Sequence, residues 1–202
     1  RDAGSGECLS DAVCTGTKPE SSQYCGDDVA FSFSCDFDPG EFCGWDNQYA
    51  SGLDTENWVL WTGAAVLRET GIGPSVDSSG SGYYLKVGDT GFLEDGTAAI
   101  DTVPVHHIPG RGSCELRFST HTYDGGGGTP PFTLDVEFRD YGTTALEATL
   151  WSSSSLPNTD AWVQHTVTLP DLPNDAFVRF MAIKTSTVSG VLGLDDVQFS
   201  NC

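Results

Sequence analysis

The sequence predicts an all-β protein: an antiparallel two-sheet β-sandwich with jelly-roll topology, cross-linked by disulfide bonds. Three observations support this fold class. Apolar and polar residues alternate with a period of two in many short segments, as in strands that bury one face. Turn-rich breaks containing Gly, Pro, Ser and Asn separate these segments, and no convincing amphipathic helix is present. Seven cysteines at varied spacing, without a CxxC pair, indicate an oxidising compartment.

The first strand signal is the alternation of apolar and polar residues from Phe31 to Phe37. The segment 56–69 has some helical character, but Gly63 and the surrounding aromatic and β-branched residues favour a strand. Some nine or ten short strands are expected in all, which indicates an antiparallel sandwich or jelly roll. The remaining predicted strands are 83–87, 97–103, 114–121, 132–139, 145–151, 162–169, 178–183 and 191–199.

Residues 1–34 differ in kind from the rest of the chain. They are rich in Gly, Ser and Asp, and they hold Cys8, Cys14 and Cys25. We expect an N-terminal extension that is packed on, or tethered to, a single domain at 35–202. A chain of 202 residues is long enough for one good core and short for two.

The charge balance narrows the choice of partners. Nine Lys and Arg residues stand against 29 Asp and Glu residues, for a formal net charge of −20. Nucleic acid is excluded as a partner because phosphate binding needs clustered cations, and an anionic membrane surface is disfavoured for the same reason. No apolar run approaches the ~20 residues of a bilayer span, so membrane insertion is not expected. Since the chain starts at Arg1, we expect that a signal peptide or propeptide has been removed and that the protein is secreted.

The most informative site signal is an acidic pair, Asp195-Asp196, inside an apolar segment near the C-terminus. Adjacent strand residues point to opposite faces, so one carboxylate is directed toward the interior or an edge groove. A buried carboxylate needs a fixed partner. In a jelly roll the first and last strands commonly lie near one another, which would bring Asp38 close to this pair.

The candidate metal ligands are Asp38, Asp195, Asp196 and Asp77, an acid in the loop that contains Gly73-Pro74. Converging carboxylates repel one another without a cation, and with Ca²⁺ they supply the oxygen ligands that this ion prefers. The prediction is a structural Ca²⁺ site, of the weak ~10⁻⁴ to 10⁻³ M class found in extracellular modules. The alternative is that one aspartate accepts backbone or Trp N–H groups while the other is solvated.

Other candidate functional residues carry weaker signals. Trp151 is the best candidate for an exposed aromatic contact with a ligand or partner. The four histidines lack a paired spacing, which disfavours a transition-metal site. No nucleophile elbow, zinc-protease motif or papain-type cysteine context is present, so no catalytic residue is assigned and the chain is predicted not to be an enzyme.

Several ordered segments together resemble the MAM domain, a module of extracellular receptors and proteases. The matching positions, in chain order, are 35–45, Asn57-Trp58, Gly73-Pro74 followed by Asp77, 82–85, 114–118, Trp162 and Asp195-Asp196. The resemblance covers 35–202 and implies two disulfide bridges, Cys35–Cys43 and Cys114–Cys202. The second bridge would close a loop on the order of 90 residues, worth ~4 kcal/mol in the chain-entropy model.

Three cysteines remain after these pairings: Cys8, Cys14 and Cys25. One pair can form among them, which leaves one thiol that is either intermolecular or buried and inert. A disulfide-linked oligomer is therefore one expectation for this chain.

The resemblance implies a secreted, non-catalytic module that works through protein–protein contact, in adhesion or self-assembly. The alternative is a Ca²⁺-dependent, lectin-like jelly roll that binds glycans. An enzyme on this scaffold is a lesser alternative, because fold does not fix function.

Overall fold

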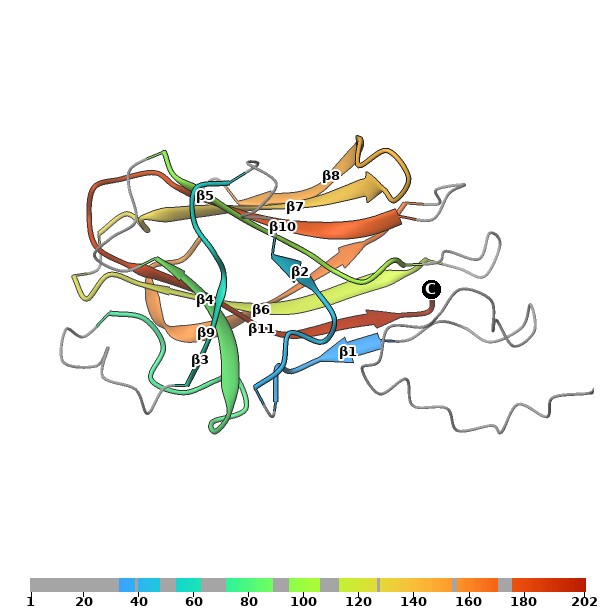
Figure 1. Ribbon diagram of the computed structural model, residues 1–202. Helices are drawn as coiled ribbons and strands as arrows, with labels where there is room; N and C mark the ends of the chain where they lie inside the picture. The colour runs from blue at the N-terminus through green and yellow to red at the C-terminus, as the bar shows by residue number, and fades with distance from the viewer. Residues whose placement is uncertain are drawn as a thin grey trace, which may run out of the picture.

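The computed structural model describes residues 33–38, 40–47, 54–62, 72–88, 95–105, 113–126, 128–153, 156–170 and 176–202. Every regular element within these ranges is a β-strand, and the eleven strands form two antiparallel sheets that face each other (Figure 1). The fold is therefore the predicted two-sheet β-sandwich. The predicted extension at 1–34, with Cys8, Cys14 and Cys25, lies outside the described residues except for its last two positions.

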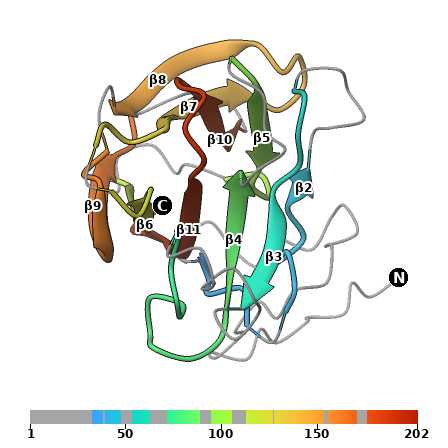
Figure 2. The same cartoon turned by 90° about the vertical axis from the view of Figure 1, so that its left-hand side faces the viewer.

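The first sheet has six strands. Its main path runs β3 (Val59–Thr62), β4 (Tyr83–Gly88), β11 (Val191–Ser200), β6 (Glu115–Tyr123) and β9 (Thr159–Thr168). The sixth strand, β1 (Phe33–Cys35), pairs with the C-terminal part of β11. The last strand of the chain thus lies in the middle of this sheet (Figure 2).

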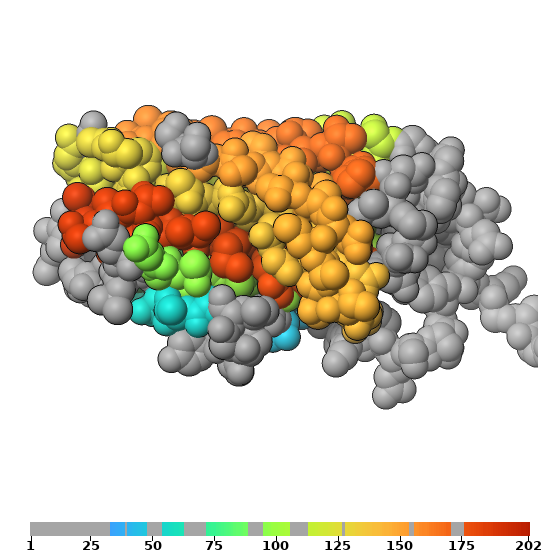
Figure 3. Space-filling model, turned by 90° about the horizontal axis from the view of Figure 1, so that it is seen from above, coloured from blue at the N-terminus to red at the C-terminus, as the bar shows by residue number. Residues whose placement is uncertain are grey.

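The second sheet has five strands, in the order β2 (Asp46–Asn47), β5 (Thr97–Asp101), β10 (Ala176–Lys184), β7 (Phe132–Asp140) and β8 (Leu146–Ser153). From β4 to β11 the chain passes to the other sheet at every step except β7 to β8, as expected of a jelly roll. Figure 3 looks onto the outer side of this sheet, where β7 and β8 (yellow to gold) lie beside β10 (red).

The predicted strands from residue 83 onward correspond to β4 through β11, with ends that differ by a few residues. The segment 56–69 contributes β3, as its aromatic and β-branched content indicated. The expectation of nine or ten strands was slightly low, because β2 has only two residues, both polar, and leaves no periodic signal.

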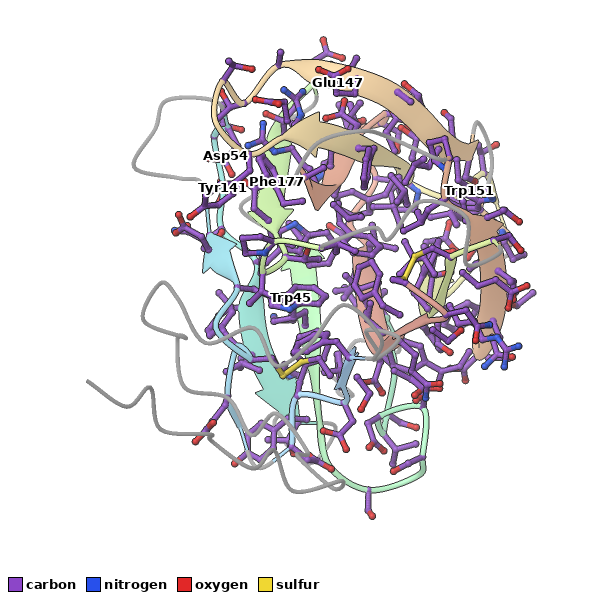
Figure 4. The ribbon with its side chains drawn as sticks, turned by 90° about the vertical axis from the view of Figure 1, so that its right-hand side faces the viewer. Trp45, Asp54, Tyr141, Glu147, Trp151 and Phe177 are labelled. Atoms are coloured by element: carbon purple, nitrogen blue, oxygen red, sulfur yellow. A yellow bond between two sulfur atoms is a disulfide. The ribbon has the colours of Figure 1, made fainter. Side chains whose placement is uncertain are left out.

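A series of aromatic rings fills the space between the sheets. Phe37 meets Trp45 edge-on at a centroid distance of 5.3 Å, and Trp45 stacks on Phe180 at 5.8 Å. Phe180 meets Phe118 at 5.3 Å, and Phe118 meets Trp151 at 5.5 Å. Figure 4 shows the two tryptophans well separated across this interior. Both sheets contribute rings, so the series joins the two layers into one core.

Two disulfide bridges close the sandwich, and they are the pairings that the MAM resemblance implied. Cys35–Cys43 spans eight residues and encloses the turn after β1. Cys114–Cys202 spans 88 residues and joins the residue before β6 to the last residue of the chain. Cys114 and Cys202 are fully buried, so this bridge belongs to the core.

Candidate functional site

The pairing of β1 with β11 brings the two ends of the described chain together. Phe33 pairs with Phe199 and Cys35 pairs with Val197, so the turn after β1 lies beside the Asp195-Asp196 segment. The expected proximity of the first and last strands is therefore present. We call the region that holds Asp38, Asp77 and Asp195 the acidic corner.

Asp38 is positioned by the tight turn inside the Cys35–Cys43 loop. Phe37 has a left-handed backbone (φ 59°), and its carbonyl accepts hydrogen bonds from the N–H groups of Gly40 (2.7 Å) and Glu41 (3.2 Å). The Phe37 side chain is fully buried, which fixes this turn to the core. The Tyr83 N–H donates to Asp38 Oδ1 (2.8 Å) and so ties the turn to the start of β4.

Asp77 is buried in the loop before β4, and one of its oxygens lacks a partner. Ser79 Oγ donates to Asp77 Oδ2 (2.7 Å), while Asp77 Oδ1 is buried without a hydrogen-bond partner among the described residues. A Cβ added at Gly82 would lie 2.5 Å from Asp38 Oδ1 and 2.7 Å from Asp77 Oδ2. The two carboxylates therefore meet over a position where only glycine leaves room for them.

Asp195 is almost fully buried, and both of its oxygens accept backbone N–H groups. Ser78 N–H donates to Oδ2 and Asp196 N–H donates to Oδ1, each at 2.8 Å. Burial, with a smaller contribution from the nearby Asp77 carboxylate, raises the pKa of Asp195 to about 6 against the opposing effect of the hydrogen bonds from Ser78 and Asp196.

Asp196 is directed elsewhere. It has a left-handed backbone (φ 49°) at the register shift between β11 and β6, and its Oδ1 accepts a hydrogen bond from Gln198 Nε2 (2.8 Å). The structure thus brings Asp38, Asp77 and Asp195 together and leaves Asp196 outside that group.

The donor set at the acidic corner consists of two carboxylates. Within the described ranges, no three or more His, Cys, Asp or Glu side chains have an arrangement that could hold a metal ion. Asp195 already accepts two backbone N–H groups, as in the alternative considered from the sequence. Asp38 and Asp77 converge, and one buried oxygen of Asp77 has no hydrogen-bond partner in the part of the chain that the structure describes. Two converging carboxylates fit a hard cation that takes its other ligands from carbonyls and water.

The loop that carries Asp77 lies across the outer face of the six-stranded sheet. Tyr84 Oη donates to the Pro74 carbonyl (3.0 Å), and Trp162 Nε1 donates to the Val76 carbonyl (2.9 Å). The Trp162 ring in turn covers Gly193, where an added Cβ would lie 2.9 Å from it. Side chains from β4 and β9 therefore hold this loop on the sheet.

Buried His121 lies under the same loop. Its ring meets Trp162 edge-on at 5.4 Å, and its Nε2 lies 3.3 Å from Asp160 Oδ1. Burial lowers the pKa of His121, and this effect exceeds the opposing influence of the exposed Asp160 carboxylate.

Trp151 differs from the expected freely exposed aromatic. It is half-buried, and its ring packs against Phe118 and against His165 at a centroid distance of 4.8 Å. Its part in ligand contact stays a prediction. Trp45 and Trp58 are buried, and Trp162 is half-buried beneath the loop.

A buried ion pair on the second sheet was not anticipated from the sequence. Arg179 on β10 donates to both oxygens of Asp101 on β5, through Nε (2.6 Å) and a terminal nitrogen (2.7 Å). Arg179 is 1% exposed and Asp101 7%. The signal was an arginine within an apolar strand of a chain that has few cations.

Comparison with solved structures finds the same fold in two adhesin domains and in CBM27-1. The chain is similar to the K1 cleaved adhesin domain of Lys-gingipain from Porphyromonas gingivalis W83, with a TM-score of 0.60, 14% identity and coverage of 86% of this chain and 99% of that chain. For the K2 cleaved adhesin domain of Lys-gingipain the TM-score is 0.57 and the identity 14%, and the match covers 84% of this chain and 99% of that chain. For CBM27-1 of Caldicellulosiruptor saccharolyticus, solved in complex with mannohexaose, the TM-score is 0.54 and the identity 13%, and the match covers 86% of this chain and 99% of that chain. At these identities the likeness concerns the fold alone.

The described residues contain no helix that is long and apolar enough to cross a membrane. The family model described as the MAM domain, meprin/A5/mu, matches residues 35–202. That range begins at the first cysteine of the Cys35–Cys43 bridge and ends at the cysteine that closes the second bridge. The chain therefore belongs to the MAM family of extracellular modules.

Proposed function

We propose that this chain is a secreted, non-catalytic module that acts through protein–protein contact, in adhesion or in assembly with itself. The observation that carries this proposal is the MAM match over 35–202, which takes in both disulfides and the whole described sandwich except Phe33 and Ser34.

Bead aggregation tests the adhesive role. Beads coated with the full chain are mixed with one another and with beads that carry extracellular matrix proteins. We expect aggregation or capture by at least one of these surfaces, and none with beads that carry the reduced, unfolded chain. Dispersed beads in every mixture would contradict the proposal.

The second part of the proposal is a structural Ca²⁺ at the acidic corner, held by Asp38 and Asp77. The support is the convergence of the two carboxylates over Gly82 and an oxygen of buried Asp77 that has no hydrogen-bond partner among the described residues. The ion would neutralise two nearby negative charges in a chain of net charge −20 and would connect the turn after β1 to the loop before β4.

Thermal unfolding with and without Ca²⁺ tests this site. For a site of the ~10⁻⁴ to 10⁻³ M class, about 10 mM Ca²⁺ should stabilise the fold by about 1.4–2.7 kcal/mol. In a chain of this size that stabilisation corresponds to a rise in Tm of about 3–10 °C. Asp77→Asn should abolish the rise, whereas Asp196→Asn, which alters the carboxylate bonded to Gln198, should keep it. A Tm that EDTA and Ca²⁺ leave unchanged would refute the site.

The disulfide-linked oligomer is a separate proposal, and it concerns Cys8, Cys14 and Cys25. Electrophoresis of native material without and with reductant decides it. A band at a multiple of 21.5 kDa that collapses on reduction supports covalent assembly, and a monomer in both lanes excludes it.

Glycan binding is the second candidate function. It is favoured by the shared fold with a module that was solved in complex with mannohexaose, and by Tyr141, which is 56% exposed on the β7–β8 turn (Figure 4). A glycan array read with Ca²⁺ and with EDTA separates the candidates. Selective binding that EDTA removes supports the lectin-like function. An array without selective binding to any glycan favours the protein-contact function.

A further inference from the structure

Besides the three-residue β1, four strands end the two sheets in the described part of the chain, and they differ in how well they are protected against pairing with another chain. An unprotected edge strand offers free N–H and C=O groups to an additional strand, and proteins usually shorten, bend or charge such edges. β2 has two residues and β3 has four, so both are short. β8 has two register shifts against β7, where Leu150 and Glu147 are the extra residues.

β9 is the edge that lacks this protection. It has ten residues, lies at the end of the six-stranded sheet and pairs with β6 on one side only, within the described residues (Figure 2). Its one register shift lies between Thr159 and Val163, which leaves Val163–Thr168 in regular register with β6. This six-residue segment contains no Lys, Arg, Asp, Glu, Pro or Gly. We call it the open edge.

The chemistry of the open edge is unusual for this protein. With a net charge of −20, two copies repel each other over most of their surface. The open edge carries no carboxylate, and burial lowers the pKa of His165, so this segment is neutral near pH 7. Two copies can therefore meet along it without placing acidic side chains opposite one another.

We propose that the open edge of β9 pairs with the same segment of a second copy, in antiparallel orientation, to form one sheet that is continuous through both molecules. This inference deepens the proposed function, because it names the surface and the partner for self-assembly. An antiparallel contact between identical strands has two-fold symmetry, so it closes as a dimer and leaves no free edge at the junction.

The side chains of the open edge match one another in a register centred on His165. Val163 of one copy then lies opposite Val167 of the other, and Gln164 lies opposite Thr166, on the opposite face. His165 pairs with Phe118 of β6 and Val167 pairs with buried Leu116, so the valine pairs extend the core side of the sheet. Gln164 and Thr166 are exposed and form polar pairs on the outer side.

Sedimentation velocity on matched variants tests the pairing. All proteins carry Cys8→Ser, Cys14→Ser and Cys25→Ser, so that intermolecular disulfides cannot contribute. The test variant is Gln164→Lys/Thr166→Lys, which places two ammonium groups opposite their counterparts across the two-fold axis. The control is Leu146→Lys/Thr149→Lys, which adds the same charge to exposed positions of the bulged edge β8.

We expect the parent chain to form a dimer of twice 21.5 kDa as its concentration rises from about 1 µM to about 500 µM. The test variant should weaken dimerisation by at least about tenfold, and the control should stay within about twofold of the parent. In the parent, the amide hydrogens of 163–168 should exchange more slowly as the protein concentration rises, while the exchange rates of the β8 amides should stay unchanged. This second measurement decides the question even where the test variant fails to fold.

Three outcomes overturn the inference. The parent chain stays monomeric at every concentration, the test variant and the control lose dimerisation equally, or the slowed hydrogen exchange lies outside β9. In each case bead capture by a different protein would leave the proposed function intact. Loss of both self-association and bead capture would remove the proposed function as well.

Discussion

Gly82 shows how one absent side chain shapes the acidic corner. Its hydrogen faces the carboxylates of Asp38 and Asp77, which approach from two segments that are far apart in the sequence. Any larger residue would push at least one carboxylate away, so the convergence of the pair depends on this position. The same glycine is part of the motif 82–85 that the family resemblance used.

Gly82→Ala should therefore lower stability and remove the response to Ca²⁺. We expect a loss of about 1–3 kcal/mol, because the new methyl group meets oxygen atoms at 2.5–2.7 Å. Gly80→Ala is the matched control, since Gly80 also has a positive φ (102°) but an added Cβ there meets nothing within 4 Å. Urea unfolding with and without Ca²⁺ measures both effects. Equal results for the two alanine variants would mean that backbone strain alone is responsible.

His121 makes stability depend on pH. Burial lowers the pKa of its ring in the folded state, so the unfolded chain binds a proton more readily. The stabilisation is fully present above the unfolded pKa of about 6.5 and is lost as the pH falls from there through the lower folded value. Replacing the ring with a group that does not titrate should remove this dependence.

His121→Asn should therefore show a smaller loss of unfolding free energy than the parent between pH 7 and about pH 5. The pKa of His165 is also lowered, but that histidine is present in both proteins and its effect cancels in the difference. Chemical denaturation at a series of pH values measures the two profiles. A constant offset between them would show that His121 has no part in the pH dependence.

At the scale of elements, the outer side of the second sheet depends on the ion pair between β10 and β5. Asp101 is buried beside Arg179, and desolvation raises its pKa while the bidentate guanidinium opposes that shift. Removal of the arginine would leave a buried carboxylate without its counter-ion. Such a loss costs more than the intact pair contributes.

Arg179→Met should destabilise the fold by about 3–5 kcal/mol. Arg117→Met is the control, because Arg117 forms a surface ion pair with Glu115 at 3.4 Å with half of its side chain exposed, and such pairs contribute about 0–1 kcal/mol. Adding Asp101→Leu to Arg179→Met should restore much of the stability. Thermal and urea unfolding of the three variants test this order, and equal losses for the two arginines would contradict it.

The strands could be predicted wherever their side chains alternate. β7 has an unbroken buried and half-buried alternation from Phe132 to Phe138, and its prediction was accurate. β9 was expected to begin at residue 162 but begins at Thr159, because its register shift falls in that stretch and interrupts the period of two. Short or bulged elements carry too little periodicity to be recognised.

The acidic corner was predictable only in part, because its contacts depend on loop paths. Alternation indicated that one of Asp195 and Asp196 is buried, and Asp195 is. The partners of that carboxylate, Ser78 N–H and Asp196 N–H, depend on backbone turns that carry no sequence period. Asp77 meets Asp38 because Tyr84 and Trp162 hold the intervening loop on the sheet, a tertiary effect that residue spacing does not encode.

At the scale of the whole molecule, the two disulfides restrict the unfolded chain to very different extents. The chain-entropy model assigns about 2.5 kcal/mol to the eight-residue loop of Cys35–Cys43 and about 4.6 kcal/mol to the 88-residue loop of Cys114–Cys202. The longer bridge also lies in the core, so its removal disturbs packing as well.

Cys114→Ala/Cys202→Ala should therefore cost about 2 kcal/mol more than Cys35→Ala/Cys43→Ala, as measured by urea unfolding of the two double variants. The shorter bridge should instead control the acidic corner, so its loss should weaken the response to Ca²⁺ more than the loss of the longer one. A greater loss for Cys35→Ala/Cys43→Ala would contradict the order that the chain-entropy model gives.

The antiparallel pairing of β1 with β11 has a mechanical consequence. Phe33 and Phe199 are partners, so a tension applied between residues 33 and 202 pulls on adjacent strand ends and peels their hydrogen bonds one at a time. Peeling releases only three residues before the load reaches the Cys35–Cys43 loop, while Cys114–Cys202 transfers the opposite load to the start of β6. Under such tension the Cys114–Cys202 bridge should keep the residues between its two cysteines from being extended, so lengthening is confined to the part of the chain before Cys114.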